Sequence, residues 1–397
     1  MGNIVAVTPD RDHYISSIEP FLESPLIFLR TTDWDQLIQL DPKAVIFLGD
    51  WLYEQGELVK KCRERRIPTI LMMDGTIEWK HFFENPKWSY GGNEAPYLPV
   101  QCDKVFVPGA GTYRFLDFFG NQGKCEITGL PRFDIYAEAF RTDHTENDRK
   151  KTLGVMSGNT AGYTEEQISE SKQLFEDLSR WAESQTEVEV KWRLRKGFEK
   201  VLDVKIISDE AVSLIEFLGK VDAVISQPST AAYEAMLAGL PVGLADYSTA
   251  PNYMHAAWEI HSREHISRII SEMMTPSSLK TSLQQHLLDD NIAYCGDSSE
   301  LTGRVINEIV RLASEMPENI WEFPPMIFFK VAEQIPGKTD AISYPLFERR
   351  TAYKFTSFTE LQEEYIKLKR KNEKILSALK RRTLGFWLER LISKFTR

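Results

Sequence analysis

The sequence predicts an α/β protein with two Rossmann-like, doubly wound domains and a helical C-terminal tail. Two observations carry this prediction. Short, almost wholly apolar runs alternate with longer stretches of helical period, and after the polar run Arg141–Lys151 the same alternation begins again. Because strands buried on both faces are apolar along their whole length, these runs indicate two parallel sheets covered by helices.

The first predicted domain spans residues 1–140. Pro68 introduces its most apolar strand, which stops at the turn dipeptide Asp74-Gly75. The aromatic-rich stretch Trp79–Pro99 is longer than an ordinary connection, so we expect a functional or capping loop there. The expected strands are Ile4–Val7, Leu26–Leu29, Ala44–Leu48, Thr69–Met73, Lys104–Val107 and Cys125–Thr128, and the expected helices are Leu52–Arg66 and Thr112–Phe119.

The second predicted domain spans residues 141–330. Thr164 is a candidate N-cap, with Gln167 at the capping-box position, for a helix that continues to about Ser184. The other expected helices are Asp209–Leu218 and Ala231–Ala238, and the expected strands are Thr152–Met156, Glu187–Leu194, Val204–Ile207, Ala223–Ile225 and Pro241–Leu244.

The remaining residues, 331–397, are expected to form a return segment and a basic amphipathic helix over Ser357–Lys394. Residues 366–397 hold eleven Lys or Arg and two Asp or Glu, whereas the whole chain has a formal net charge of −10. The acidic body argues against nucleic acid as a partner. The tail favours an anionic membrane surface. A coiled-coil or assembly helix is the alternative, because apolar side chains recur at helical intervals from Leu361 to Ile375.

The four cysteines are widely spaced and form neither a CxxC pair nor a Cys/His cluster. This spacing argues against a disulfide framework or a zinc site and favours a reducing compartment. The N-terminus does not resemble a signal peptide, and no stretch reaches the roughly 18 apolar residues that a bilayer span requires. We therefore expect a cytoplasmic protein, with peripheral association at the inner face of the plasma membrane if the tail binds lipid.

The pattern with the most chemical content begins where a predicted buried strand ends in Ser226-Gln227-Pro228-Ser229-Thr230. A helix follows directly, and the free N–H groups and dipole at its start favour an anion such as phosphate. Glu234 lies one turn into this helix, where it could accept hydrogen bonds from a sugar or ribose hydroxyl. An ordinary helix cap at Ser229 or Thr230 explains the same residues, and this alternative stays open.

The segment Ser-Thr-Ala-Ala-Tyr-Glu-Ala-Met-Leu-Ala-Gly-Leu-Pro-Val, residues 229–242, resembles the donor site of GT-B glycosyltransferases. Thr128–Asp134 is similar to the interdomain segment of surface-carbohydrate biosynthesis proteins, and related sheets occur in nucleotide-sugar 2-epimerases and CDP-glycerol glycerophosphotransferases. The resemblance covers roughly residues 1–311. It implies a GT-B type fold in which the second domain binds a nucleotide-sugar donor through Gln227, Ser229, Thr230 and Glu234, and the first domain holds the acceptor.

Cations are expected beside this donor site. Lys191, Arg193 and Arg195 alternate along a predicted strand and so share one face. A departing diphosphate needs its charge neutralised, and Arg195 lies nearest the carboxyl end of the strand, so Arg193 and Arg195 are the candidates. An exposed basic face is the alternative.

The turn Ser157-Gly158-Asn159 follows the first strand of the second domain and is a further candidate for donor binding. Gly158 would let the backbone approach a ligand closely. A plain strand-to-helix turn explains the same residues.

The first domain offers candidates for a catalytic base. Asp74 follows a buried strand, at the edge of the sheet where ligands bind in such folds, and Glu78 and His81 are its rivals. Glycerophosphotransferases carry a histidine-glycine pair where this chain has Asp74-Gly75, so the resemblance does not transfer the base directly. No DxD-like pair follows a strand, and we therefore expect no metal and no cofactor beyond the nucleotide-sugar substrate.

These inferences favour a metal-independent GT-B glycosyltransferase that moves a sugar from a nucleotide sugar to a cell-surface polysaccharide or glycolipid. Three alternatives stay open: a nucleotide-sugar 2-epimerase, a glycerophosphotransferase, and a non-catalytic sugar-binding scaffold of a surface-polymer complex.

Overall fold

The computed structural model describes residues 2–8, 12–86, 96–139, 150–196, 198–202, 206–209, 211–249, 254–335 and Lys367. The chain forms two compact units, Met1–Ala332 and Glu333–Arg397. Apart from Lys367, the predicted tail helix Ser357–Lys394 lies outside the described residues, as does most of the polar run 141–151. The expectations for the tail therefore stay predictions.

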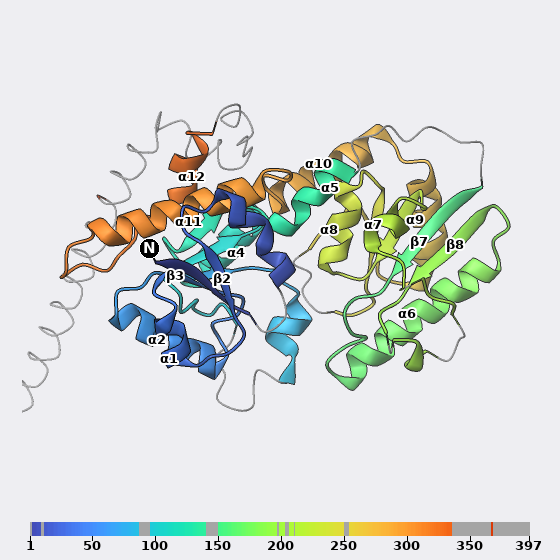
Figure 1. Ribbon diagram of the computed structural model, residues 1–397. Helices are drawn as coiled ribbons and strands as arrows, with labels where there is room; N and C mark the ends of the chain where they lie inside the picture. The colour runs from blue at the N-terminus through green and yellow to red at the C-terminus, as the bar shows by residue number, and fades with distance from the viewer. Residues whose placement is uncertain are drawn as a thin grey trace, which may run out of the picture. The chain divides into compact units, whose positions relative to one another are not determined.

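The first sheet contains six parallel strands in the order β2-β1-β3-β4-β5-β6. Its strands are buried along most of their length, as expected for a sheet with helices on both faces. Figure 1 shows this sheet in the blue-to-cyan half of the molecule. The strands are β1 (Asn3–Val7), β2 (Leu26–Leu29), β3 (Pro42–Phe47), β4 (Thr69–Met72), β5 (Lys104–Val107) and β6 (Cys125–Ile127), all within one or two residues of the sequence prediction.

The second sheet contains five parallel strands in the order β11-β10-β9-β7-β8. Its strands are β7 (Lys151–Met156), β8 (Val188–Arg193), β9 (Ala223–Ser226), β10 (Val242–Ala245) and β11 (Trp258–Ile260). The α/β prediction of two doubly wound sheets is thus confirmed, although β11 was not among the predicted strands.

Two predicted elements between β8 and β9 differ from the structure. The prediction of a strand at Val204–Ile207 is wrong for residues 206 and 207, which the structure describes. Residues 206–209 make only an isolated bridge, between Ser208 and Trp192. The helix expected from Asp209 is shorter, because α7 spans only Leu214–Leu218. The Ser213 side chain sets its start by accepting a hydrogen bond from the Glu216 N–H at 3.2 Å.

The predicted helices that flank the sheets are present as α2 (Tyr53–Glu64), α4 (Ala110–Phe118), α6 (Glu165–Glu183) and α8 (Thr230–Leu237). Thr164 caps α6 as expected, since its hydroxyl accepts from the Gln167 N–H at 3.3 Å. The Gln167 amide oxygen in turn accepts from the Tyr163 N–H at 2.9 Å, one residue earlier than a capping box would place that bond.

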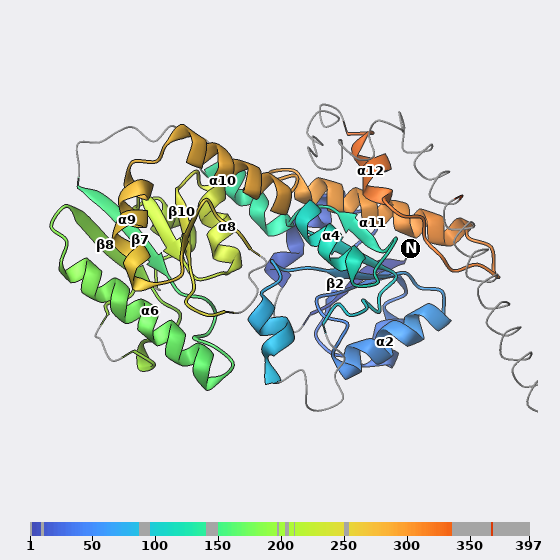
Figure 2. The same ribbon diagram turned by 180° about the vertical axis from the view of Figure 1, so that it is seen from behind.

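After the second sheet, the chain returns to the first one. The helices α9 (Arg263–Met274) and α10 (Ser278–Asn291) are followed by α11 (Ser298–Glu315), which packs against the first half, and by α12 (Ile327–Ala332), which packs against β6. Figures 1 and 2 both show the orange α11 running along the first half. The Asp134 carboxylate, at the start of α5 (Asp134–Ala139), fixes this crossing by accepting from the N–H groups of Gly296, Ser298 and Ser299.

A buried ion pair attaches the returning segment to the first sheet. Lys104 Nζ of β5 lies 2.6 Å from Glu126 Oε1 of β6, with exposed side-chain fractions of 1% and 0%. The ammonium also donates to the carbonyls of Gly123 and Pro324, and the carboxylate accepts from the Phe328 N–H at 2.8 Å. Both ions thus find further hydrogen-bond partners, which a buried pair needs if it is not to be costly.

Replacing Lys104 with methionine should therefore lower the free energy of unfolding by about 3–5 kcal/mol, because the Glu126 carboxylate would lose its buried cation. Urea unfolding at pH 7 measures this loss. The double variant Lys104→Met/Glu126→Leu should recover part of it, since it removes both charges. A loss below about 1 kcal/mol in the single variant would contradict this role for the pair.

Candidate functional site

The two sheets meet at a cavity of about 810 Å³ that lies at the carboxyl ends of their strands. Val7 at the end of β1 and Asp74 after β4 contribute from the first half, and Met156 at the end of β7 contributes from the second. This is where open α/β sheets bind ligands. Of the twelve residues predicted from the sequence, eleven line the cavity: Asp74, Glu78, His81, Ser157, Gly158, Asn159, Arg193, Arg195, Ser229, Thr230 and Glu234.

The N-terminus of α8 forms part of the second-half wall. Ser229 is the N-cap and makes no side-chain capping hydrogen bond, whereas the Thr230 hydroxyl accepts from the Thr76 N–H of the first half at 3.3 Å. The Ser226–Thr230 turn therefore faces the space between the sheets, as the anion-site prediction requires. Thr230 differs from the expectation in one respect, because its hydroxyl already joins the two halves.

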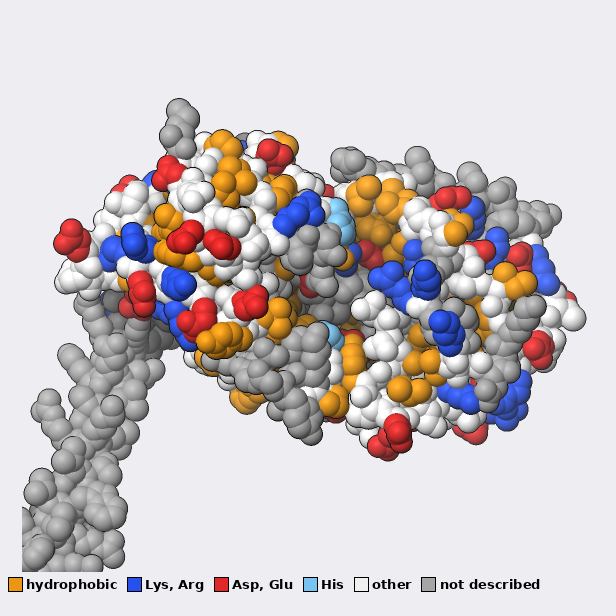
Figure 3. All heavy atoms as spheres, turned by 60° about the horizontal axis from the view of Figure 1, so that its bottom comes forward, with side chains coloured by type: hydrophobic (Ala, Val, Ile, Leu, Met, Phe, Trp, Pro, Cys, Tyr) orange, Lys and Arg blue, Asp and Glu red, His pale blue; other side chains and the backbone are white. Residues whose placement is uncertain are grey.

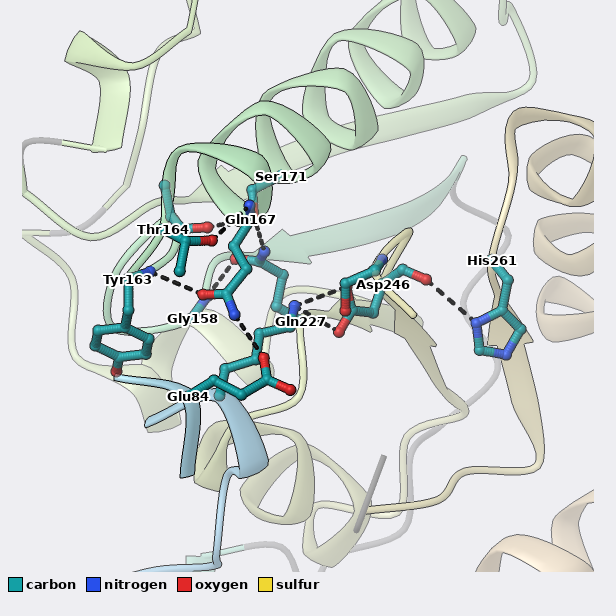
Figure 4. A network of polar contacts seen from close by, with 12 residues as sticks. Glu84, Gly158, Tyr163, Thr164, Gln167, Ser171, Gln227, Asp246 and His261 are labelled. Carbon is teal, nitrogen blue, oxygen red and sulfur yellow. Dashed lines mark hydrogen bonds and ion pairs between the residues drawn. The ribbon is translucent and has the colours of Figure 1, made fainter. Parts of the chain in front are cut away.

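Gln227, the twelfth predicted residue, lies behind the wall and does not line it. Its side chain is buried, its Oε1 accepts from the Gly158 N–H at 2.9 Å, and its Nε2 donates to Ser171 Oγ at 3.0 Å. Figure 4 shows Gln227 between Gly158 and Ser171. Gln227 therefore shapes the turn after β7, and the Gly158 amide is already bonded within the protein.

The same turn positions a cation. The Ser157 hydroxyl accepts from the Arg195 N–H at 2.8 Å and donates to the Gly158 carbonyl at 3.1 Å. Arg195 is exposed and Arg193 is partly buried, and both line the cavity. Lys191 does not, since β8 ends at Arg193 and the Lys191 ammonium lies 3.9 Å from Glu189 Oε1 instead. The predicted basic face thus contributes two of its three cations to the cavity wall.

Glu234 is buried in the cavity wall beside an arginine that was not among the predicted site residues. Arg132, in the short helix η4 (Pro131–Phe133), places its NH1 3.1 Å from Glu234 Oε1. Burial raises the pKa of Glu234, while Arg132 and then a hydrogen bond from Tyr136 oppose that rise. Arg132 belongs to the segment Thr128–Asp134, which carries part of the family resemblance. A charged residue in an interdomain segment was therefore the sequence feature that could have identified Arg132 as a site residue.

The first-half wall carries the candidate acid–base groups. Asp74, Glu78 and His81 all line the cavity and are partly buried. Burial raises the pKa of Glu78 to about 7; Lys80 opposes this rise, and Asp246 adds to it. A carboxyl group with a pKa near neutrality is suited to proton transfer at physiological pH, which favours Glu78 on this criterion.

Contacts beside this wall join the halves. In η3 (Lys80–Glu84), the Lys80 ammonium lies 2.7 Å from Asp246 Oδ2, and both side chains are largely buried. Glu84 Oε2 accepts from Gln167 Nε2 at 2.7 Å (Figure 4). The rings of His81 and Tyr163 lie 5.3 Å apart. In the space-filling view a hollow separates the halves, with imidazole groups at its edge (Figure 3).

Two aromatic residues of the predicted loop Trp79–Pro99, Trp79 and Tyr97, do not line the cavity. Trp88 and Tyr90 are outside the described residues, Trp79 packs against Phe83, and the buried Tyr97 packs against Trp51 and Phe82. Trp51 does line the cavity, with Tyr14, Phe82 and Tyr163. Trp51 comes shortly after the predicted strand Ala44–Leu48, and this place at the carboxyl end of a strand was the sequence signal available for it.

No protein-family model matches the chain, and no curated protein matches it in sequence. Solved structures match in shape. S. aureus MnaA, in a co-structure with UDP, gives a TM-score of 0.55 at 16% identity, covering 81% of this chain and 100% of its own. A putative UDP-N-acetylglucosamine 2-epimerase from Listeria monocytogenes gives 0.55 at 14% identity, over 81% and 100%. The Neisseria meningitidis UDP-GlcNAc 2-epimerase bound to UDP-GlcNAc gives 0.51 at 13%, over 78% and 100%.

The chain has the GT-B fold. The resemblance to nucleotide-sugar 2-epimerases expected from the sequence is thereby confirmed at the level of the fold. Within the described ranges, this GT-B protein has no helix that is long and apolar enough to cross a membrane. In the same ranges, no three His, Cys, Asp or Glu side chains gather closely enough to hold a metal ion.

Breaking the Lys80–Asp246 pair should loosen the junction of this GT-B protein. In Lys80→Met, we expect amide hydrogen exchange in residues 76–84 to accelerate about tenfold, because a partly buried Asp246 carboxylate would lose its cation. Exchange measured by mass spectrometry on matched peptides tests this. Lys60→Met is the control, since Lys60 pairs with Glu57 on the exposed face of α2 and should leave exchange unchanged. Equal exchange in both variants would contradict a junction role for Lys80.

Proposed function

We propose that this protein is a GT-B enzyme that binds a nucleotide sugar in the cavity between its sheets and transfers the sugar to a cell-surface polysaccharide or glycolipid acceptor. The observation that carries the proposal is the composition of the second-half wall. Arg193, Arg195 and the N-terminus of α8 together offer cations and helix N–H groups, the combination that suits a diphosphate.

The two walls suggest a division of labour. The second half would hold the diphosphate against Arg193, Arg195 and Ser229, with the nearby Glu234 carboxylate accepting hydrogen bonds from ligand hydroxyls. The first half would present the acceptor near Asp74 and Glu78. A cavity whose charges are fixed in advance can stabilise the departing diphosphate without much reorganisation.

Glu78 is the base that we favour for the acceptor hydroxyl. In its ionised form it can take the proton as the new bond forms at the sugar carbon, and a pKa of about 7 keeps it partly ionised at neutral pH. Asp74 and His81 line the same wall and are the competing candidates.

A nucleotide-sugar 2-epimerase is the second candidate function. It is favoured by the shape match to the putative UDP-N-acetylglucosamine 2-epimerase of Listeria monocytogenes and to the Neisseria enzyme bound to UDP-GlcNAc. An epimerase would convert the nucleotide sugar without any acceptor. A new sugar nucleotide formed from pure UDP-GlcNAc would favour this reading over the transferase.

Ligand binding should stabilise the protein. Among UDP, CDP, GDP, CMP and UDP-GlcNAc, we expect at least one to raise Tm by several degrees when it is present at about 100 times its Kd. Arg195→Ala should reduce the shift, because it removes a cation from the cavity wall. Lys191→Ala is the matched control, since Lys191 pairs with Glu189 outside the cavity. No shift with any of these ligands would rule out the donor site as proposed.

Turnover should depend on pH through Glu78. With a sugar linked to the nucleotide that stabilises the protein best, and with water as the acceptor, nucleotide release should become faster as pH rises through about 7, because a base acts only when deprotonated. Glu78→Gln should remove this rise and slow release about 10²- to 10⁴-fold. If Glu78→Gln keeps the wild-type profile while Asp74→Asn loses activity, the base is Asp74.

A further inference from the structure

The pair formed by Arg132 and Glu234 joins two parts of the chain that the fold brings together at the cavity. Arg132 belongs to the segment that leaves the first sheet, and Glu234 belongs to α8 of the second half. Arg132 NH1 lies 3.1 Å from Glu234 Oε1, with exposed side-chain fractions of 20% and 8%. Both residues line the cavity, so the pair forms part of the wall that a ligand would meet.

The guanidinium of Arg132 is held in place by rings. Its central carbon lies 5.0 Å from the centre of the Tyr14 ring and 4.8 Å from that of Phe133. Cation–π contacts of this kind fix the plane of a guanidinium as well as its position. The orientation of the Arg132 guanidinium toward Glu234 is therefore set by its packing against Tyr14 and Phe133.

The charged and titratable groups around Glu234 come from several elements. Arg132 approaches from η4, Tyr136 from α5, and Arg193 and Arg195 from the end of β8 and beyond. The carboxyl groups of Asp74 and Glu78 line the opposite wall of the same cavity. Burial raises the pKa of Glu234, and of the groups that oppose this rise, Arg132 has the largest effect.

We propose that Arg132 is a positioning residue, which pairs with the Glu234 carboxyl group and orients it in the cavity wall so that it can accept hydrogen bonds from ligand hydroxyls. The role of Glu234 toward ligand hydroxyls rests on the proposed function, whereas the effect of Arg132 on Glu234 does not. The ability of Glu234, on α8, to bind a ligand therefore depends on the position of the segment that carries Arg132 between the two halves. A buried carboxylate that lost this partner would take up a proton more readily.

The first test needs no ligand. If Arg132 is replaced by glutamine, the folded-state pKa of Glu234 should rise further above its unfolded value, so the folded state binds more protons there. Stability should then fall as pH rises through that interval. We expect urea unfolding of Arg132→Gln to lose stability from pH 5 to pH 8 relative to Arg132→Gln/Glu234→Gln, and Arg132→Lys to restore most of the wild-type dependence.

The second test uses UDP as the probe and measures its Kd from pH 5 to pH 9. The pH below which the affinity for UDP falls should rise by about one unit or more in Arg132→Gln and by less in Arg132→Lys. The same measurement in variants that also carry Glu234→Gln gives the contribution of UDP's own titration, which is then subtracted. Identical pH dependence of stability in Arg132→Gln and its double variant would overturn the proposal, as would Arg132→Lys behaving like Arg132→Gln. If UDP does not bind the wild-type protein, the nucleotide that stabilises it best in the thermal-shift screen replaces UDP as the probe. If none of them binds, the proposed function fails, and the first test still decides the role of Arg132.

Discussion

The close approach of the two halves at Gly75 is the constraint on which the candidate site depends. A Cβ added to Gly75 would lie 2.4 Å from Thr230 Oγ1, well inside van der Waals contact. The backbone after β4 therefore touches the N-terminus of α8 directly, and the Thr76 N–H donates to the Thr230 hydroxyl. A side chain at Gly75 would therefore displace the Thr230 hydroxyl at the point where the two halves touch.

Charge at the junction follows from parallel sheets meeting by their carboxyl ends. Polar side chains collect at those ends, and the facing half removes water from them. Lys80 meets Asp246, Glu84 meets Gln167, and Arg132 meets Glu234, so each group obtains a partner from the other half in exchange for its lost hydration. The same arrangement leaves Arg193 and Arg195 on one wall of the cavity and Asp74 and Glu78 on the other, and the proposed transfer reaction uses both sets.

The two crossings between the halves pack against each other. Gly129 has a φ of +76°, and a Cβ there would lie 2.3 Å from the Ala293 carbonyl oxygen. A few residues later, Asp134 accepts from three N–H groups at the start of α11. The segment that carries Arg132 is thus fixed on both sides of η4. This explains how a residue outside both sheets can hold a defined position in the cavity wall.

The sequence by itself determined the two parallel sheets, because strands buried on both faces must be apolar throughout, and this local property is visible residue by residue. It also determined which polar residues stand at or after the ends of the strands, and hence most of the eleven predicted residues that line the cavity, since all parallel strands end at one edge. The strand β11 was not predicted, because the segment Ala257-Trp258-Glu259-Ile260 is only weakly apolar and did not show the pattern of a buried strand.

Only the tertiary structure decided what each polar group does. Gln227 and Glu234 stand seven residues apart in one motif, yet Gln227 supports the backbone of another turn, and Glu234 pairs with an arginine 102 residues away. The pKa of Glu78 likewise depends on burial and on Asp246 from the other half. Hydrogen bonding and desolvation depend on distances between segments remote in the chain, and these distances exist only once both sheets have formed and met.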